Sequence, residues 1–482
     1  MSAARKRVAV VGGGFAGLVA AVAVAEQGHE VVLLEARRRL GGRAYSFRDA
    51  ATGSTVDNGQ HAMMGCYTRT LAFLERIGTA DRVVRQQDLH VAMRDPRRGA
   101  AAISAPALPA PLHVLGGLLR YRFLTVNERL RALVAGLRIM TMRRNGDPFL
   151  AQATVAELLA ELGQSRNACA SFWYPIAVAT CNETPERAAA APFAEVLALG
   201  FFGSRTDSQF VFARVGLSEL YTDAAESRIV ATGGRVEVGA QVTAIEVRDG
   251  RACALALRDG RRIAFDACIL AAPPLATQAL LPAEIASRAP WRDLASLGAS
   301  PIVSVHLWYD RPVLDGDFAG LVGTTTQFAF DRTRLCGTRV DEQGSQVSAV
   351  ISAAHDEETW DNALLAATVV ADIEAAFPAA RGAQLVRSVV VKEKHATISC
   401  TPAAERLRPG PETPLDDLFV AGDWTATGLP PTIEGAVRSG ERAAGLAAAR
   451  LTSSTRAGAS SVGSVSGATA GDERPRQASV GG

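Results

Sequence analysis

The chain has 482 residues, enough for two or three domains with cores of their own. Its 51 basic and 49 acidic side chains leave a net charge of +2, which gives no electrostatic case for nucleic-acid binding. The seven cysteines are scattered and never spaced as CxxC. This pattern predicts neither a metal site nor a disulfide framework, and it is typical of free thiols in the reducing cytoplasm. No uninterrupted apolar stretch of about 20 residues predicts a membrane-spanning helix.

The first informative segment is a glycine-rich turn between a strand and a helix. Residues 8–11 are an apolar run that predicts a strand, and Gly12, Gly14 and Gly17 then form the pattern G-x-G-x-x-G. Gly12 permits a sharp turn, Gly14 lets the backbone approach a pyrophosphate, and Gly17 lets the helix pack closely on the strand. The amides at the start of that helix then point at the phosphates.

A second strand is predicted at residues 31–34 and ends at Glu35. A carboxylate at this point accepts hydrogen bonds from ribose hydroxyls and repels a 2′-phosphate. Strand, turn, helix and carboxylate together predict a site for the ADP half of a dinucleotide. The basic residues 5–7 before an apolar run also resemble a secretory signal, but three glycines interrupt that run. We therefore expect no export signal.

Along the rest of the chain, segments typical of an α/β domain alternate with segments that are mainly helical or antiparallel strands. This alternation predicts an α/β fold with a discontinuous domain. Residues 96–212 are mainly helical, and residues 295–400 read as antiparallel strands with one helix. Beyond Thr452 large apolar residues are almost absent, which predicts a disordered tail over 452–482. The predicted division is a nucleotide-binding domain of residues 1–95, 213–294 and 401–451, and an inserted α+β substrate domain of residues 96–212 and 295–400.

A second candidate site lies near the C-terminus. Residues 418–421 predict a strand, and Gly422 and Asp423 follow at its end, where open α/β sheets bind ligands. Thr432 can cap the helix that follows. The positive end of that helix can favour the anionic form of a reduced flavin, or the helix can be an ordinary capped helix after a turn. The residues alone leave both interpretations open.

The segments LLEARRRLGGR and AGDWTATGLPPTIEGAVRSGERAA resemble the FAD-dependent amine oxidase and phytoene desaturase superfamily, over about residues 5–450. Three motifs are most similar to the hydroxysqualene dehydroxylases: TVDNGQHAMMGCYTRTLAFLERIG, WYPIAVATCNETPERA and GDWTATGLPPTIEGAV. The resemblance implies a Rossmann-like FAD domain of the glutathione-reductase and amine-oxidase type. It also implies reduction of hydroxysqualene to squalene in hopanoid and isoprenoid biosynthesis. In that reaction an acid assists loss of water, and reduced flavin delivers a hydride.

The same resemblance implies the contacts to FAD. It assigns the pyrophosphate to Gly12, Gly14 and Gly17, and the adenosine ribose to Glu35. The amine oxidases' cysteine that bonds to flavin is not recognisable, so FAD is expected to be non-covalent. The remaining implied contacts lie in the E-A-R and G-G-R elements, the loop before His61, the β-ribbon and the C-terminal motif: Ala36, Arg37, Gly42, Arg43, Gly59, Gln60, Val242, Gly422, Asp423 and Ile433.

The acid that protonates the leaving hydroxyl is not fixed by the sequence. His61 is the first candidate because the resemblance places its loop at the flavin and histidine donates protons near neutral pH. A structural histidine explains the same residue. Tyr67 and Asp57 are weaker candidates, and Asp57 can instead cap a turn. The long hydrocarbon substrate predicts an apolar channel, for which Met63, Met64 and Phe210 are among the candidate lining residues.

So apolar a substrate needs a route to the site. The candidate segment for this route is residues 106–144, which mix apolar residues with arginines. This segment can lie at a membrane surface with its arginines at the headgroups, or it can pack on the second domain with solvated arginines. The expected location is therefore the cytoplasm, with peripheral contact to a membrane as one option. The alternatives in function are a carotenoid-type desaturase and a non-catalytic prenyl-binding relative. The electron donor is not identified by any motif.

Overall fold

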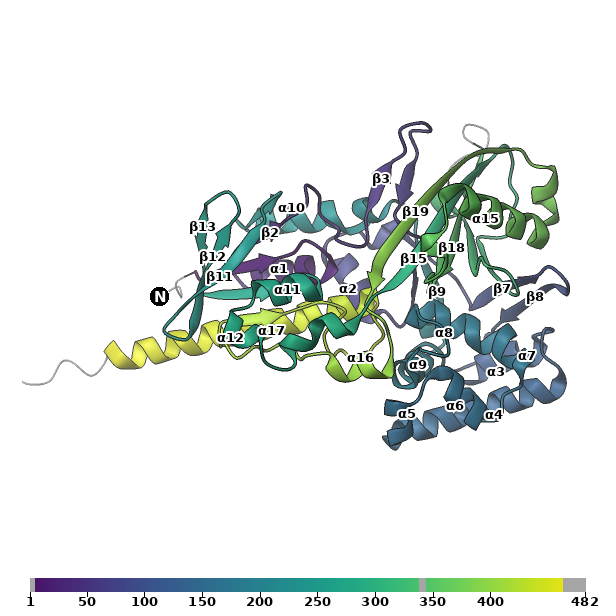
Figure 1. Ribbon diagram of the computed structural model, residues 1–482, viewed down its shortest axis with the longest axis horizontal. Helices are drawn as coiled ribbons and strands as arrows, with labels where there is room; N and C mark the ends of the chain where they lie inside the picture. The colour runs from purple at the N-terminus through teal and green to yellow at the C-terminus, as the bar shows by residue number, and fades with distance from the viewer. Residues whose placement is uncertain (1–4, 338–343, 463–482) are drawn as a thin grey trace, which may run out of the picture.

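A five-stranded parallel sheet forms the half of the molecule drawn on the left in Figure 1. The structure is a computed structural model and describes residues 5–337 and 344–462. The strands of this sheet come from three separated parts of the sequence, and all neighbouring pairs run parallel. In spatial order they are β10 (Arg235–Val238), β2 (Glu30–Glu35), β1 (Arg7–Val11), β14 (Ala267–Leu270) and β20 (Leu418–Val420).

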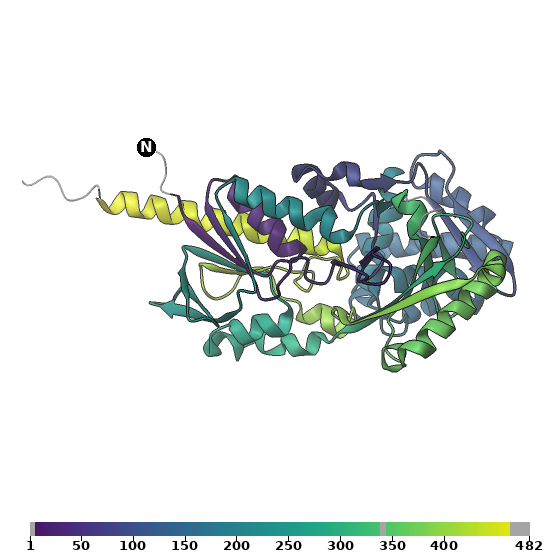
Figure 2. The same ribbon diagram turned by 90° about the horizontal axis from the view of Figure 1, so that it is seen from above.

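Helix α1 (Phe15–Glu26) is apolar on all sides because it is enclosed on all sides. It packs on the sheet, on α10 (Asp223–Ala231) and on the long C-terminal helix α17 (Ile433–Val462). A Cβ on Gly440 of α17 would lie 2.3 Å from the carbonyl oxygen of Ala16, so only glycine permits this approach. The first and last helices of the chain therefore pack side by side, as Figures 1 and 2 show.

The other face of the parallel sheet packs against a small antiparallel sheet and short helices. Trp291 and Trp424 are almost fully buried in this layer. Its elements are β11 (Val242–Arg248), β12 (Arg251–Leu257), β13 (Arg262–Ala264), α11 (Pro274–Leu280), α12 (Ala283–Ala286) and α16 (Pro402–Leu407).

A seven-stranded sheet forms the second half of the molecule. One face packs against helix α15 (Asn362–Ala376). All neighbouring pairs are antiparallel except β16 and β7. The predicted domain boundary at residue 95 is displaced, because β7 pairs within this second sheet. In spatial order the strands are β19 (Leu385–Thr397), β15 (Ser300–Tyr309), β18 (Ser345–Ser352), β17 (Phe328–Asp331), β16 (Phe318–Leu321), β7 (His90–Asp95) and β8 (Gly99–Ser104).

Two small sheets join the halves, and a helical layer lies beneath the second half in Figure 1. The long strands β15 and β19 run back toward the nucleotide-binding half (Figure 2). The small sheets are β3 (Ser46–Arg48) with β4 (Thr55–Asp57), and β5 (Ala62–Met64) with β9 (Phe210–Ala213) and β6 (Val83–Arg85). The remaining helices are α2 (Thr68–Arg76), α3 (Leu112–Arg120), α4 (Val126–Arg144), α5 (Pro148–Gln152), α6 (Val155–Glu161), α7 (Arg166–Ala168), α8 (Tyr174–Cys181), α9 (Ala190–Leu197) and α13 (Arg332–Cys336).

The end of the chain differs from the sequence prediction. Helix α17 continues to Val462, so the prediction of disorder from Thr452 is wrong for residues 452–462. No proline interrupts the segment, and extending a helix that is already formed costs less free energy than starting a new one. The rest of the predicted tail, residues 463–482, lies outside the described residues. Within the described part of the chain, none of the helices has the length and apolar character needed to cross a bilayer.

Candidate functional site

The glycine turn between β1 and α1 has the geometry that a pyrophosphate requires. Gly12 has a φ of +110°, and a Cβ on Gly17 would lie 1.9 Å from the carbonyl oxygen of Gly12. At Gly14, in contrast, a Cβ would meet only the Cα of Gly42, 3.9 Å away. Helix α1 starts without a side-chain cap, so its first amides are free to bind an anion. The turn is thus closed where it packs and open where phosphate would approach.

Glu35 lies at the end of β2 with its carboxylate oriented by two backbone amides. The amide of Gly13 donates to Oε2 at 2.7 Å and the amide of Arg37 donates to Oε1 at 2.8 Å. The amide of Ala240 donates to the carbonyl of Glu35 at 2.9 Å, which brings Val242 beside the end of β2. The predicted ribose and adenine contacts therefore lie next to each other.

The E-A-R and G-G-R elements lie directly over the glycine turn. Ala36 is exposed at the end of β2, and Nη1 of Arg37 donates to the carbonyl of Gly42 at 3.0 Å. A Cβ on Gly42 would lie 3.2 Å from the Cα of Gly14. These residues are close enough to the turn to share one phosphate group.

Arg43 connects three distant segments of the chain. Its Nη2 donates to Oδ1 of Asp423 at 2.5 Å and its Nη1 donates to the carbonyl of Ala396 at 3.2 Å. The Asp423 side chain is only 7% exposed, so this carboxylate depends on the guanidinium for its charge balance. The ion pair brings the N-terminal and C-terminal motifs together at one site.

The backbone at Gly422 is fixed by its neighbours. A Cβ there would lie 2.4 Å from Nε1 of Trp424, whose indole N–H donates to the carbonyl of Ala272 at 3.0 Å. The Gly422 amide donates to the hydroxyl of Ser439 on α17 at 3.0 Å. The residue after β20 is thereby held between the neighbouring strand and the last helix.

The start of α17 is a capped helix, as the sequence predicts. The Gly435 amide donates to Oγ1 of Thr432 at 3.2 Å. Glu434, which is 2% exposed, accepts from the amide and hydroxyl of Thr70 at 2.9 and 2.8 Å. The contact of Ile433 with a flavin stays a prediction.

His61 lies in a tight loop, and its hydrogen bonding determines which ring atom is available. Nδ1 lies 2.8 Å from the carbonyl oxygen of Gly59, which makes it the donor in the neutral ring. Desolvation lowers the pKa of His61, while Asp57 and Glu393 act to raise it. Nε2 is the ring atom left for a substrate. Next to the ring, Gln60 has a buried Oε1 without a hydrogen bond in the described part of the chain.

The other two acid candidates lie in different surroundings. Asp57 accepts from the Ser46 hydroxyl at 2.7 Å and the Leu217 amide at 2.9 Å, and Arg332 lies 3.4 Å from its Oδ2. These contacts hold the carboxylate in place and give it a structural role. Burial raises the pKa of the Tyr67 phenol, which lies against the start of α17.

Three buried polar residues on the large sheet were not predicted as site residues from the sequence: Ser304, His306 and Ser348, here called the polar trio. His306 pairs with Ser348 across β15 and β18, which puts their side chains on one face. The two hydroxyls and both imidazole nitrogens are buried without a hydrogen-bond partner among the described residues. The signal was present in the run IVSVHLWYD, where serine and histidine alternate with residues that pack on α15.

The polar trio is set in an aromatic wall beside the His61 loop. A Cβ on Gly59 would lie 3.3 Å from Oγ of Ser304 and 4.0 Å from Cε1 of His61. The phenylalanines of this wall include Phe318, whose ring centroid lies 5.0 Å from that of Phe210. Members of the same apolar cluster are Phe212, Phe328 and Phe330. The arrangement places a few polar atoms against a buried apolar cluster, with Asp57 and Arg332 close enough to act on His306.

Burial lowers the pKa of His306 to about 4, although Asp57 acts to raise it. In the unfolded chain His306 therefore takes up a proton near pH 6.5, whereas in the folded chain it does so only near pH 4. Because the unfolded state binds more protons between these values, the free energy of unfolding falls as pH falls from 6.5 to 4. We expect the wild type to lose about 3 kcal/mol more than His306→Gln over this range. Urea unfolding at several pH values measures the difference. Parallel curves for the two proteins would contradict a neutral buried His306.

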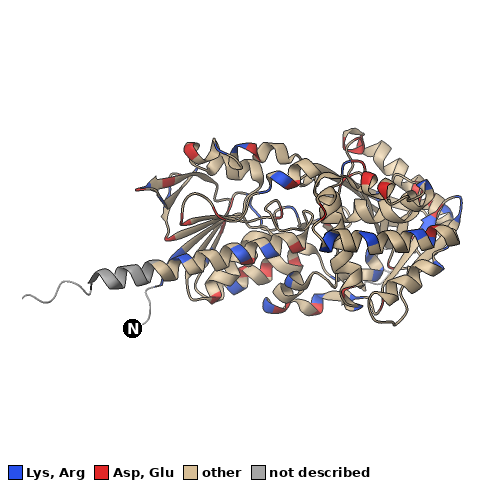
Figure 3. Cartoon of the chain, turned by 90° about the horizontal axis from the view of Figure 1, so that it is seen from below, with Lys and Arg blue, Asp and Glu red and all other residues tan. Residues whose placement is uncertain are grey.

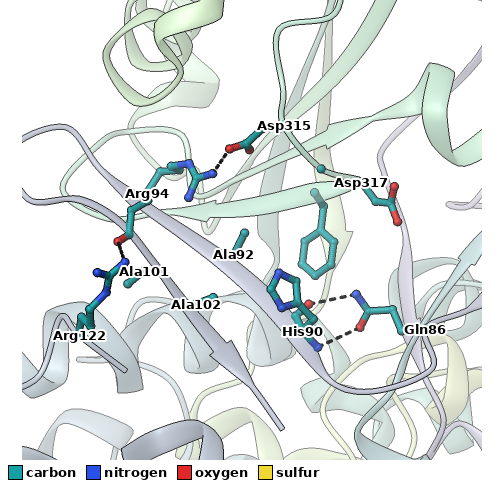
Figure 4. Close-up of a pocket in the computed structure, with 12 residues that line it drawn as sticks. Gln86, His90, Ala92, Arg94, Ala101, Ala102, Arg122, Asp315 and Asp317 are labelled. Atoms are coloured by element: carbon teal, nitrogen blue, oxygen red, sulfur yellow. Dashed lines mark hydrogen bonds and ion pairs between the residues drawn. The ribbon is translucent and has the colours of Figure 1, made fainter. Parts of the chain in front are cut away.

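A separate cavity on the large sheet does not belong to this site. It has a volume of about 370 Å³ and is lined by the Arg94–Asp315 ion pair, His90, Arg122 and Asp317 (Figure 4). None of the residues predicted to bind FAD lines it. Charged walls of this kind do not suit a hydrocarbon.

Comparison with known proteins agrees with this geometry. Residues 15–448 match the family model for flavin-containing amine oxidoreductases. A hydroxysqualene dehydroxylase from Rhodopseudomonas palustris is 28% identical over 448 residues, covering 92% of this chain and 98% of the relative. A 15-cis-phytoene desaturase from an Oncidium hybrid cultivar is 25% identical, covering 90% of this chain and 76% of the relative. An oxidoreductase from Methanosarcina mazei has the same fold, with a TM-score of 0.70 at 17% identity, covering 90% of this chain and 99% of that structure.

The predicted α/β fold with a Rossmann-like FAD domain is thus confirmed, and so are FAD as cofactor and catalytic activity. The residues present fit the cofactor, because the open space at Gly14 and the uncapped start of α1 form a ready phosphate site. This chain belongs to the flavin-containing amine oxidoreductase family and is an FAD-dependent oxidoreductase.

Proposed function

We propose that this flavoprotein reductively removes the hydroxyl group of hydroxysqualene to give squalene, a precursor in hopanoid biosynthesis. Full-length similarity to a protein named hydroxysqualene dehydroxylase supports the proposal. The observation that carries it is the polar trio. A substrate that is hydrocarbon except for one hydroxyl needs an apolar wall with a single polar position, and Ser304 and His306 provide one beside the His61 loop.

The chemistry sets three demands on the site. Replacing the hydroxyl by hydrogen consumes two electrons and two protons and releases water. FAD supplies the redox chemistry when it is bound and reduced. The protein must protonate the leaving oxygen, orient the allylic carbon and keep water out, because water would trap the cation that forms.

We assign these tasks to residues of this chain. Ser304 and the neutral His306 bind the hydroxyl oxygen, and the phenylalanine wall around Phe318 excludes water. His61 is the proposed proton donor, because Nε2 is its free ring atom and because desolvation lowers its pKa, which makes the protonated ring a stronger acid toward the leaving hydroxyl.

The proton donor can be tested by its pH dependence. Desolvation lowers the pKa of His61, so the neutral ring predominates near neutral pH and the protonated fraction grows as pH falls. We expect the rate to rise as pH falls, and His61→Gln to lower it by about a hundredfold and to remove the pH dependence. The measurement is a pH–rate profile of both proteins. An unchanged profile in the variant would assign the proton to another group, with Tyr67 the next to be replaced.

The redox direction distinguishes this proposal from the alternative of a carotenoid-type desaturase, which the similarity to phytoene desaturases keeps open. Holoenzyme with oxidised or reduced FAD is incubated without oxygen with hydroxysqualene or with phytoene, and the products are identified by mass spectrometry. Squalene from hydroxysqualene and the reduced form alone supports the proposal. New double bonds in phytoene with the oxidised form would replace it.

We also propose that the protein works in the reducing cytoplasm, since all seven cysteines are free thiols in the structure. Its electron donor would be a separate reductant.

A further inference from the structure

Large apolar side chains are exposed mainly in one part of this molecule. Of fifteen such side chains in the described residues, eight fall between residues 108 and 149. They are exposed by 37 to 66%. A concentration of this kind marks a surface that another apolar phase covers. The eight are Leu108, Leu112, Leu119, Val126, Leu130, Val134, Leu137 and Phe149.

Helix α4 explains why these side chains point outward together. Val126, Leu130, Val134 and Leu137 are spaced by four, four and three residues, which places them in one stripe along the helix. The opposite side of α4 carries the small and buried residues Ala132, Ala135, Gly136 and Ile139. Helix α3 packs beside α4, and both lie at the lower edge of the molecule in Figure 1. The stripe is therefore left uncovered by the fold itself.

The same segment carries a local excess of positive charge. Residues 106–149 contain seven arginines and two acidic residues in a chain whose net charge is only +2. Both acidic side chains are engaged in helix capping, Glu128 with Thr125 and Asp147 with Phe149. Arg143 is paired with Glu195. Figure 3 shows the basic residues as blue bands along this side of the molecule.

Six of the seven arginines have no carboxylate partner in the described part of the chain, and two of these, Arg122 and Arg129, donate instead to backbone carbonyls. The guanidinium groups of Arg120, Arg131, Arg138 and Arg144 make no ion pair with any residue that the structure describes, and all four residues are exposed. Arg131 and Arg138 directly follow Leu130 and Leu137 on α4, so they border the apolar stripe. Unpaired guanidinium groups beside exposed leucine and valine match the chemistry of an anionic lipid surface, with phosphates above and acyl chains below.

We propose that the face formed by α3, α4 and α5 docks on the surface of an anionic lipid bilayer. The stripe of Val126, Leu130, Val134 and Leu137 enters the boundary between headgroups and acyl chains, and the unpaired arginines bind lipid phosphates. The described helices cannot span a bilayer, so the contact is interfacial. This inference rests on the proposed function in one respect, because a bilayer is where a C30 hydrocarbon would be stored. A second copy of the chain fits less well, since the arginines of two such faces would repel each other.

The test is co-sedimentation of the full-length holoenzyme with vesicles of phosphatidylcholine, with or without phosphatidylglycerol. We expect binding to the anionic vesicles that weakens at high salt. Leu130→Glu with Val134→Glu should reduce the bound fraction about tenfold or more, and so should Arg131→Gln with Arg138→Gln. The matched control is Leu364→Glu with Val386→Glu, since these two are equally exposed on the other side of the second half. This control should bind like the wild type.

Three results would overturn the proposal: no binding at low salt, equal binding by the Leu130 and Val134 variant, or a dimer in solution that this variant abolishes. The last result would assign the face to a second copy of the chain. The vesicles contain no hydroxysqualene, so the measurement is independent of catalysis. Docking without dehydroxylation would overturn the proposed function alone, and dehydroxylation without docking would overturn this inference alone.

Discussion

Gly17→Ala is expected to destabilise the nucleotide-binding half severely, whereas Gly14→Ala should leave the apoprotein folded and impair only FAD binding. A Cβ on Gly17 would lie 1.9 Å from the carbonyl oxygen of Gly12, where α1 and β1 have no room to separate. We expect a loss of more than about 3 kcal/mol in the free energy of unfolding. A Cβ on Gly14 meets no atom closer than 3.9 Å, so the fold tolerates it.

The effect of Gly14→Ala should appear only with the cofactor. Its methyl group would project toward the space that a pyrophosphate needs, and we expect FAD affinity to fall about tenfold or more. Urea unfolding of both apoproteins and FAD titration by flavin fluorescence measure the two effects separately. Equal affinity for FAD in Gly14→Ala and wild type would contradict a phosphate site at this turn.

Arg43→Met is expected to cost about 3–5 kcal/mol in stability and to weaken FAD binding. The guanidinium is the charge partner of Asp423, a carboxylate that is 7% exposed, so removing it leaves a buried charge unpaired. Asp423→Asn should cost less, because it leaves only the more exposed Arg43 without a partner. The double variant Arg43→Met with Asp423→Asn should recover much of the stability, since neither charge remains.

The double variant separates structural from cofactor effects. If Arg43 and Asp423 also contact FAD, stability returns in the double variant and affinity does not. Thermal unfolding with and without FAD gives both quantities. Recovery of both would show that the pair serves only to join the two ends of the chain.

The parts of the fold that could be predicted from the sequence are those determined by local patterns. The turn from Gly12 to Gly17 and the cap at Thr432 were predicted correctly because each depends on residues within one turn of a helix. The helical character predicted for residues 96–212 is seen in α4, whose start is a capping box at Thr125.

The parts that failed depend on contacts between distant segments. Strand β7 was placed with the nucleotide domain because its pairing with β16 joins residues more than two hundred positions apart. The role of Asp57 was obscure because its cation, Arg332, is equally remote. The sequence did not identify Ser304 and His306 as site residues. The role of a polar residue in an apolar strand depends on which side chains pack against it, and these come from distant segments.

The most direct test of the proposed function is a single turnover. Holoenzyme whose FAD has been reduced is mixed with hydroxysqualene without oxygen, while flavin absorbance and squalene are followed together. The prediction is one squalene formed for each FAD that returns to the oxidised form, at the same rate in both signals. Flavin that stays reduced in the presence of bound hydroxysqualene would contradict it.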